Sequence, residues 1–101
     1  MGMVVTTVDG LEPTETRLLL CAAIMLGDVA HRHWNHREWF VRDRKTGRER
    51  TCTAAIDELW LAGWIKFTPH GEGTRVGLTS IGAAILDEHG GKVLKRYRET
   101  T

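Results

Sequence analysis

The sequence has few cysteines and no hydrophobic stretch long enough to cross a lipid bilayer. Its two cysteines, Cys21 and Cys52, lie far apart among 101 residues. A structural metal site or a redox motif usually takes cysteines in close pairs, so we expect two reduced, buried thiols. The longest apolar run covers residues 18–26, which falls well short of the roughly 20 residues that a transmembrane helix needs.

Signals for secretion and for catalysis are missing as well. The first residues lack the basic start and the small-residue cleavage site of a secretory signal, which favours a cytoplasmic protein. We find no phosphate-binding glycine loop, no paired carboxylates in a pocket-forming context and no nucleophile beside a base. The sequence therefore predicts neither an enzyme nor a cofactor.

Three histidines, His31, His33 and His36, have a spacing that invites a zinc site, because imidazole binds zinc when three ligands converge. No carboxylate or cysteine is placed to complete such a site. We interpret the cluster as an exposed polar corner and expect no metal.

A net charge of +1 does not by itself indicate a nucleic-acid partner, but the charges are segregated along the chain. Residues 31–50 carry seven basic and three acidic side chains, a net of +4, and residues 91–101 carry a net of +3. Residues 9–30 and 51–90 each carry a net of −3. Two basic segments therefore lie in a chain that is otherwise acidic.

The length and composition predict one compact domain. With 42% hydrophobic residues among 101, the chain has enough apolar material for a single core. We divide it into a flexible N-terminal arm (residues 1–10), a domain (11–89) and a basic C-terminal tail or helix extension (90–101). The main core candidates among the aromatic residues are Trp34, Trp39, Trp60 and Trp64.

The first helix is predicted to begin near Pro13 and to run to Ala30. Proline suits a first helical turn, and the acids Glu12 and Glu15 favour the positive end of the helix dipole. The second half is apolar almost all the way round, so it must be covered on every side. We expect a second chain to cover what the core does not, although the C-terminal helix of the same chain is the alternative. The predicted dimer contacts are Leu18, Leu19, Ile24 and Met25.

Residues 37–46 support two interpretations, a short helix or one strand. Residues 39–41 are consecutively apolar, and such a run has no period that separates the two structures. We favour the short helix. Gly47 then permits the tight turn that a following helix needs.

The clearest helix is predicted from Thr51 to Ala62, where apolar residues recur at the spacing of one helical face. We expect Gly63 to end this helix in a left-handed conformation. The inner face holds Cys52, Ala55, Ile56, Leu59 and Gly63, and the outer face holds Thr53, Ala54, Asp57, Glu58 and Leu61.

A hairpin and a last helix are predicted after Gly63. Residues 64–68 and 75–78 have strand-like patterns on either side of a glycine-rich turn. Thr79 or Ser80 is suited to cap a final helix, which ends near residue 90.

Two stretches carry a family resemblance. In winged-helix regulators a turn leads into the recognition helix, which is followed by the entry to the wing. The first part is similar to Thr46-Gly47 in this chain, the second to residues 50–59 and the third to residues 62–65. Leu78-Thr79, Gly82 and Leu86 resemble the exit from the wing in MarR-type and related regulators. Residues 11–89 thus resemble a winged helix-turn-helix domain. This resemblance implies an α+β fold, mostly helical, with three helices, a β-hairpin wing and a C-terminal helix.

The resemblance also implies that residues 48–57 enter the major groove of duplex DNA and that residues 66–76 form the wing. The first turn of a helix can contact base edges there, while arginine and lysine neutralise phosphates. The alternative is that the cations only form a solvated surface. Because Asp57 and Glu58 oppose deep insertion, we expect contacts at the N-terminal end of the helix. The candidate DNA-binding residues are Arg42, Arg44, Lys45, Arg48, Arg50, Thr51, Thr53, Ala54, Asp57, Lys66 and Arg75.

The predicted function is that of a transcriptional regulator, a homodimer that binds an inverted repeat with recognition helices about 34 Å apart. The alternative is a winged-helix module that binds a protein through Asp57, Glu58 and Leu61, since a fold does not fix a function. The first hypothesis predicts affinity for duplex DNA. The second predicts partner binding that depends on Leu61, without affinity for DNA.

Overall fold

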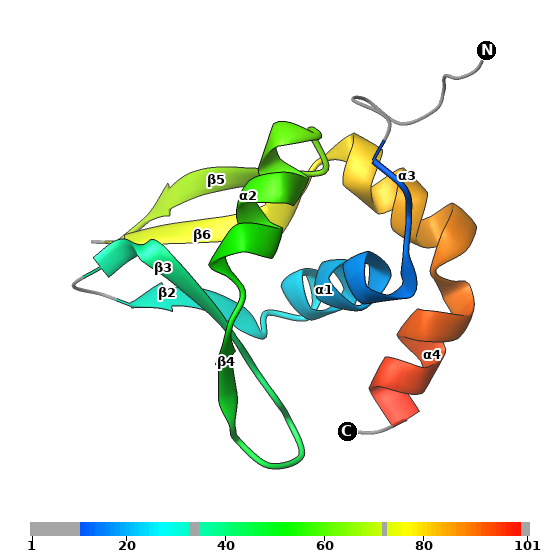
Figure 1. Ribbon diagram of the computed structural model, residues 1–101, viewed down its shortest axis with the longest axis horizontal. Coiled ribbons are helices and arrows are strands. Elements are labelled where there is room, and N and C mark those ends of the chain that lie inside the picture. Colours follow the sequence, from blue (N-terminus) through cyan, green and yellow to red (C-terminus); the bar gives the residue numbers. More distant parts are fainter. Residues whose placement is uncertain (1–10, 33–34, 72, 100–101) are drawn as a thin grey trace.

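The structure consists of helices and antiparallel β-sheets, which confirms the predicted α+β class (Figure 1). The computed structural model describes residues 11–32, 35–71 and 73–99, and the predicted arm over residues 1–10 lies outside them. No helix among the described residues is long and apolar enough to cross a membrane. In chain order the elements are α1 (Glu15–Met25), β2 (Val29–Arg32), β3 (Asn35–Arg42), β4 (Glu49–Thr51), α2 (Thr53–Leu61), β5 (Ile65–His70), β6 (Gly73–Leu78), α3 (Ser80–His89) and α4 (Gly91–Glu99).

Helix α1 begins where the sequence indicated but ends earlier. Thr14 caps it, because its hydroxyl oxygen accepts a hydrogen bond from the backbone N–H of Arg17 at 3.3 Å. The helix ends at Met25, and strand β2 begins at Val29, which pairs with Val41 of β3. The prediction of a helix to Ala30 was therefore wrong at its C-terminal end, because the last residues gain a strand partner that only the tertiary structure supplies.

The short helix favoured for residues 37–46 was wrong, because this segment forms most of β3 and the turn after it. β3 is the central strand of a sheet with the order β2-β3-β4, and it is antiparallel to both neighbours. Trp39 is buried, and Phe40, which points to the opposite face, is half-buried. Because both faces of the strand are partly covered, the alternation that marks a half-buried strand is lost. The described residues contain no helix between α1 and α2.

Helix α2 and the hairpin after it form as predicted. Within α2, Ile56 is buried in the core while Leu61 points to solvent. Gly63 follows with a φ of +80°, the left-handed conformation expected of the residue that ends a helix. Strands β5 and β6 pair in one continuous register, from Ile65 opposite Leu78 to His70 opposite Gly73.

Thr79 joins the start of α3 to the end of α2. Its hydroxyl oxygen accepts a hydrogen bond from the N–H of Gly82 at 3.2 Å, and the hydroxyl donates one to the carbonyl oxygen of Gly63 at 2.6 Å. This confirms the predicted cap. Helix α4 begins directly after α3 and contacts α1, so the C-terminal segment is a helix extension over the residues that the structure describes.

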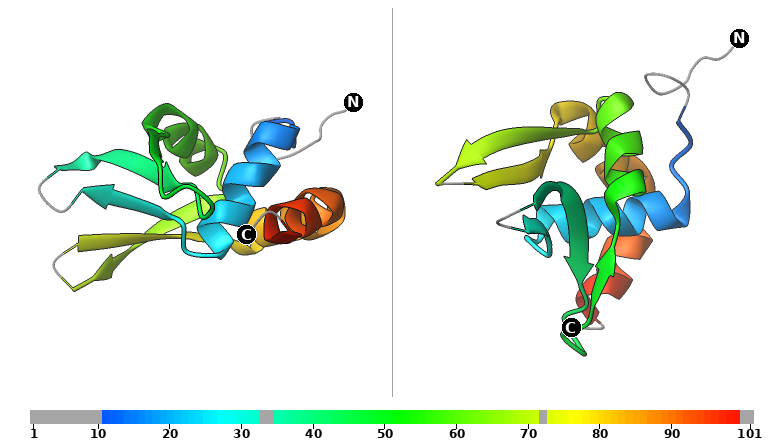
Figure 2. Two further views of the ribbon diagram at one scale, coloured as in Figure 1. Left: turned by 90° about the horizontal axis from the view of Figure 1, so that it is seen from below. Right: turned by 60° about the vertical axis from the view of Figure 1, so that its left-hand side comes forward.

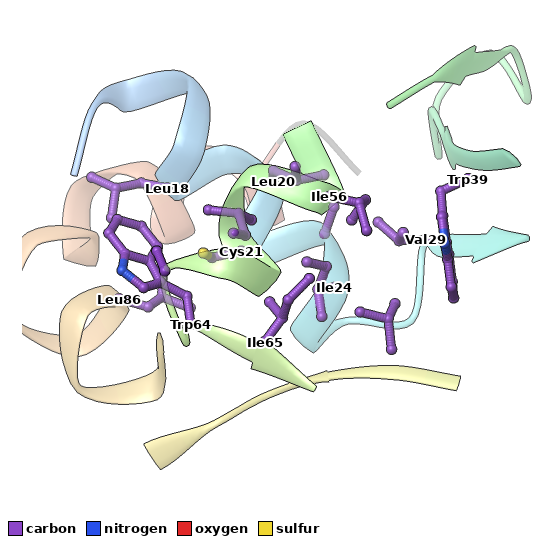
Figure 3. Close-up of a cluster of buried hydrophobic side chains, with 14 of the residues drawn as sticks. Leu18, Leu20, Cys21, Ile24, Val29, Trp39, Ile56, Trp64, Ile65 and Leu86 are labelled. Atoms are coloured by element: carbon purple, nitrogen blue, oxygen red, sulfur yellow. The ribbon is translucent and has the colours of Figure 1, made fainter. Parts of the chain in front are cut away.

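The core lies where α1, α2 and the β5–β6 hairpin meet, and α3 closes it (Figure 3). The ring of Trp64 lies beside Leu18 and Leu86 at one end of the core, and Trp39 lies at the other end. Both tryptophans are buried, as predicted. Trp60 was also placed in the core, but it is 51% exposed, and Trp34 lies outside the described residues.

The β2–β3 and β5–β6 hairpins lie side by side and project together from the helices (Figure 2). Trp39 of β3 stacks on Phe67 of β5, with ring centroids 5.3 Å apart. The backbone N–H of Thr74 donates a hydrogen bond to Nε2 of His31 at 2.7 Å. His31 therefore joins the two hairpins, and the described residues contain no group of three side chains that could hold a metal ion.

Neighbours within the same chain cover most of α1. Helices α3 and α4 and strand β6 all pack against it. Leu18 and Ile24, two of the four predicted dimer contacts, are 4% and 5% exposed in the core of one chain. Only Leu19, at 38% exposed, and Met25, at 43%, present apolar surface to solvent.

Candidate nucleic-acid interface

The predicted DNA-binding residues that precede α2 lie on an exposed β-ribbon. We call residues 42–50 the basic ribbon, which consists of the end of β3, a turn and most of β4. Every residue in it is exposed, and the ribbon extends away from the body of the molecule (Figure 1). Its five basic side chains, against two acidic ones, are Arg42, Arg44, Lys45, Arg48 and Arg50.

The turn of the basic ribbon is held by its own side chains. The carboxylate of Asp43 accepts hydrogen bonds from the backbone N–H of Lys45 at 2.7 Å and of Thr46 at 3.1 Å. These two bonds, the Thr46 one first, lower the pKa of Asp43, and the positive charges of Arg50 and Lys45 add to the effect. Gly47 has a φ of +75°, which glycine adopts with little strain. The turn therefore presents its cations on a defined backbone.

Two of the five cations are engaged in ion pairs. Arg42 pairs with Glu49 across the ribbon at 2.9 Å. Arg44 pairs with Asp28 at 2.6 Å and also donates to the carbonyl oxygen of Leu26. These contacts tie the ribbon to itself and to the end of α1. The three remaining cations, Lys45, Arg48 and Arg50, form no ion pair with any described residue.

Helix α2 follows the basic ribbon directly and carries the opposite charge. It contains Asp57 and Glu58 and no lysine or arginine. Glu58 is paired with Arg17 of α1 at 2.6 Å. At the start of the helix, the hydroxyl oxygen of Thr53 accepts a hydrogen bond from the backbone N–H of Trp39 at 3.0 Å, while Ala54 is exposed. The outer face of α2 has no cation to neutralise a phosphate.

The predicted wing lies apart from the basic ribbon. Lys66 and Arg75 are exposed on the face of the β5–β6 hairpin opposite to Phe67. Arg75 lies 3.1 Å from Nε2 of His70, within the same hairpin. The tip of this hairpin and the turn of the basic ribbon point in different directions (Figure 1, Figure 2). The structure thus gathers the residues from Arg42 to Ala54 and leaves Lys66 and Arg75 at a second location.

Two features of the site were missed in the sequence. Asp28, the partner of Arg44, lies 16 residues before it, and no local pattern marks such a distant pair. The second feature is the exposure of Trp60, which at 51% exposed lies next to Leu61, at 69%, and forms an apolar patch with it on α2. The exposure of Leu61 was predicted from its place on the outer helix face. Trp60 was instead predicted to lie in the core, and its ring lies near that of Phe67, with 6.0 Å between the ring centroids.

Comparisons with protein families, with curated proteins and with solved structures gave no match.

Proposed function

We propose that this protein binds duplex DNA and that the basic ribbon makes the principal contacts. The observation that supports the proposal is the set of three cations, Lys45, Arg48 and Arg50, on an exposed and well-held β-ribbon with no described carboxylate paired to them. Exposed cations that form no ion pair displace counterions from DNA when they approach its phosphates. This release of counterions is the main source of non-specific affinity for DNA.

A β-ribbon suits the major groove, which admits a two-stranded ribbon as well as an α-helix. Arg48 and Arg50 have the side chains best suited to bind guanine in bidentate fashion. Thr51, at the end of β4, and Ala54, in the first turn of α2, lie next along the chain and are exposed. The carboxylates of Asp57 and Glu58 would repel phosphates, so the rest of α2 would stay out of the groove.

The proposal includes the winged-helix assignment in a changed form. Helix α2, the β5–β6 hairpin and α3 follow the order of recognition helix, wing and C-terminal helix. Strand β3, paired with β2, takes the place of the helix expected before the turn, and β4 follows the turn. Lys66 and Arg75 would then contact the DNA backbone beside the main site, and the protein would act in the cytoplasm as a transcriptional regulator.

The second part of the proposal is that the protein forms a homodimer. The apolar surface of α1 that could support a dimer is smaller than the sequence predicted. Of the four predicted contacts, only Leu19 and Met25 remain available to another copy. Light scattering at micromolar concentration tests this part alone. A mass of twice 11.4 kDa supports the dimer, and a mass near 11.4 kDa refutes it together with the inverted-repeat site.

A mobility-shift assay with a pool of random duplexes at low salt tests the DNA proposal. Reversal of two charges, Arg48→Glu with Arg50→Glu, should abolish the shift. The matched control is Lys92→Glu with Lys95→Glu, which changes the net charge equally on α4. If the ribbon matters only through net charge, both variants lose the same affinity, and the proposed interface is wrong.

A second candidate function is protein binding through the outer face of α2. Exposed Trp60 and Leu61 lie beside Asp57 and Glu58 on a helix without cations, and such an apolar patch with a polar rim is typical of protein contacts. This function is favoured if the purified protein shows no DNA affinity at low salt and a partner is recovered by wild type but not by Leu61→Ser.

A further inference from the structure

An open pocket of about 570 Å³ follows one edge of the β5–β6 hairpin, and we call it the edge pocket. Among the described strands, β6 is paired on one side only, with β5. In Figure 1 its other side is the one nearer to α1 and β2, and both of these elements contact β6. The end of α1 with the turn after it, β2 and α3 complete the walls through Ile24, Met25, Gly27, Val29 and Ala83.

The backbone of β6 is available for pairing along the edge pocket. The N–H of Thr79 donates to the carbonyl oxygen of Trp64, on the side of β5. Because backbone groups alternate in direction along a strand, Val76 and Leu78 direct theirs to the opposite side. The N–H of Thr74 has that same direction and donates to a side chain of β2. The edge pocket thus holds a row of backbone donors and acceptors, which an extended peptide can satisfy by adding a strand.

The side chains of the edge pocket are apolar apart from a single cation. Arg75 is the one charged residue among those that line it. It forms no ion pair with any carboxylate in the described part of the chain. A peptide complementary to this pocket is extended, has apolar side chains and carries one acidic group beside them.

The chain contains a segment of this kind in its N-terminal arm, outside the described residues. Residues 4–8 read Val-Val-Thr-Thr-Val, five consecutive β-branched residues of the type that favours strands. Asp9 follows directly and is the only charged side chain among residues 1–10. The charge and the apolar character of this segment match those of the edge pocket.

We propose that residues 4–9 of a second copy of the chain add to the free edge of β6 as an antiparallel strand, with Val8 opposite Val76 and Asp9 opposite Arg75. Opposite residues of an antiparallel pair lie on the same face of the sheet, so the side chain of Val8 faces the apolar walls. The carboxylate of Asp9 pairs with the guanidinium of Arg75, and hydrogen bonds between such charged groups are stronger than those between neutral ones.

The arm of the same chain is too short to fill the edge pocket. The carbonyl oxygen of Glu12 accepts a hydrogen bond from the guanidinium of Arg17 at 2.9 Å, which holds the preceding chain near the start of α1. Two residues from Leu11 reach at most about 7 Å, whereas the 11 residues of α1 span about 16 Å. Because the pocket lies at the far end of α1, Asp9 of the same chain does not reach Arg75. Two copies related by a two-fold axis can exchange arms instead.

This inference depends on the homodimer in the proposed function and supplies the contact that would form it. Met25, one of the two predicted dimer contacts that stay exposed, lines the edge pocket and would be covered by the arm. DNA binding through the basic ribbon does not depend on the inference.

Two proline substitutions in the full-length protein test the strand pairing. In the proposed register Thr6 lies opposite Leu78 and donates its N–H to β6, whereas the N–H of Thr7 points away. Thr6→Pro should therefore weaken the dimer at least about tenfold in sedimentation equilibrium. Thr7→Pro is the matched control and should leave the dimer nearly unchanged, because an edge strand tolerates proline where the N–H faces solvent.

Equal losses in the two variants, or a larger loss in Thr7→Pro, would overturn the proposed strand. If neither variant weakens the dimer, the two copies meet elsewhere, so the inference is wrong while the proposed homodimer stands. A monomer at every concentration refutes both. An arm-dependent dimer without affinity for duplex DNA supports the inference and contradicts the proposed DNA binding.

A charge exchange between two chains tests that the arm binds a second copy. Asp9→Arg and Arg75→Asp should each weaken the homodimer about fivefold. When the two variant proteins are mixed, each arm meets a pocket of opposite charge, so the mixed dimer should regain the affinity of the wild type. No recovery on mixing would show that the two side chains do not pair between copies, and the proposed register would be wrong.

Discussion

Replacement of Thr79 by alanine removes two hydrogen bonds that meet at one half-buried hydroxyl group. The hydroxyl caps α3 through the N–H of Gly82 and donates to the carbonyl oxygen of Gly63. Loss of an N-terminal cap costs about 1 kcal/mol, and loss of the donor to a part-buried carbonyl costs about 1 kcal/mol more. We therefore expect the free energy of unfolding to fall by about 2 kcal/mol.

Urea denaturation followed by circular dichroism measures this change. For a domain of this length, 2 kcal/mol corresponds to a fall in melting temperature of about 8–16 °C. Thr79→Ser is the matched control, since serine keeps both hydrogen bonds and loses only a methyl group, and it should retain most of the stability. A loss below about 0.5 kcal/mol in Thr79→Ala, or an equal loss in both variants, would refute the reasoning, because it would show that the hydroxyl group does not join α2 to α3.

Three further predictions concern burial and titration. Ile56→Ala should destabilise the protein by about 2–5 kcal/mol, because Ile56 is buried in the core, and Leu61→Ala should change stability by less than about 0.5 kcal/mol; equal effects in urea denaturation would contradict the packing of α2. Burial raises the pKa of Cys21 to about 12 and that of Cys52 to about 11, so iodoacetamide at pH 8 should alkylate both thiols only after denaturation, and rapid alkylation of the folded protein would contradict this. The pKa of Asp43 is lowered in the folded protein, so its hydrogen bonds stabilise the turn fully above the ordinary pKa of a carboxyl group. This stabilisation is lost as the pH falls through the pKa of the folded protein. The amide shifts of Lys45 and Thr46 should therefore titrate with a midpoint below pH 3.8, and a midpoint above it would show that the bonds are absent.

The parts of the fold that the sequence predicted correctly are those set by neighbours in the chain. The outer and inner faces of α2 follow from a 3.6-residue period. The cap at Thr79 and the end of α2 at Gly63 follow from residue types that suit one local conformation. No distant contact is needed to make any of these predictions.

The strand β3 could not be distinguished from a helix because its surroundings come from distant parts of the chain. Phe40 pairs with Ala30 on one side and with Thr51 on the other, and both faces of the strand are partly covered. A helical period or a strict strand alternation appears in a sequence only where one face of the element is in water. Consecutive apolar residues are what such a two-sided environment selects, and they carry no period.

The sequence predicted only part of the candidate site, because the partners of its cations depend on the tertiary structure. The cluster of cations over residues 42–50 is visible in the sequence, but the partners that occupy two of them are not. Asp28 neutralises Arg44 from the end of α1, and Glu49 neutralises Arg42 only because β3 and β4 pair in one register. Two of the four predicted dimer contacts, Leu18 and Ile24, are instead buried in the core of one chain, beside residues that follow much later in the sequence.

The salt dependence of binding to duplex DNA tests the central claim most directly. Fluorescence anisotropy with a labelled random duplex, repeated from 50 to 200 mM salt, gives the slope of log K against log salt concentration for the wild type and for Arg48→Gln with Arg50→Gln. On a random duplex Arg48 and Arg50 neutralise phosphates, and each such contact contributes about 0.9 to this slope, so the double variant should reduce its magnitude by about 1.8. An unchanged slope, or no binding by the wild type at about 50 mM salt, would contradict the assignment of the basic ribbon as a DNA-binding surface.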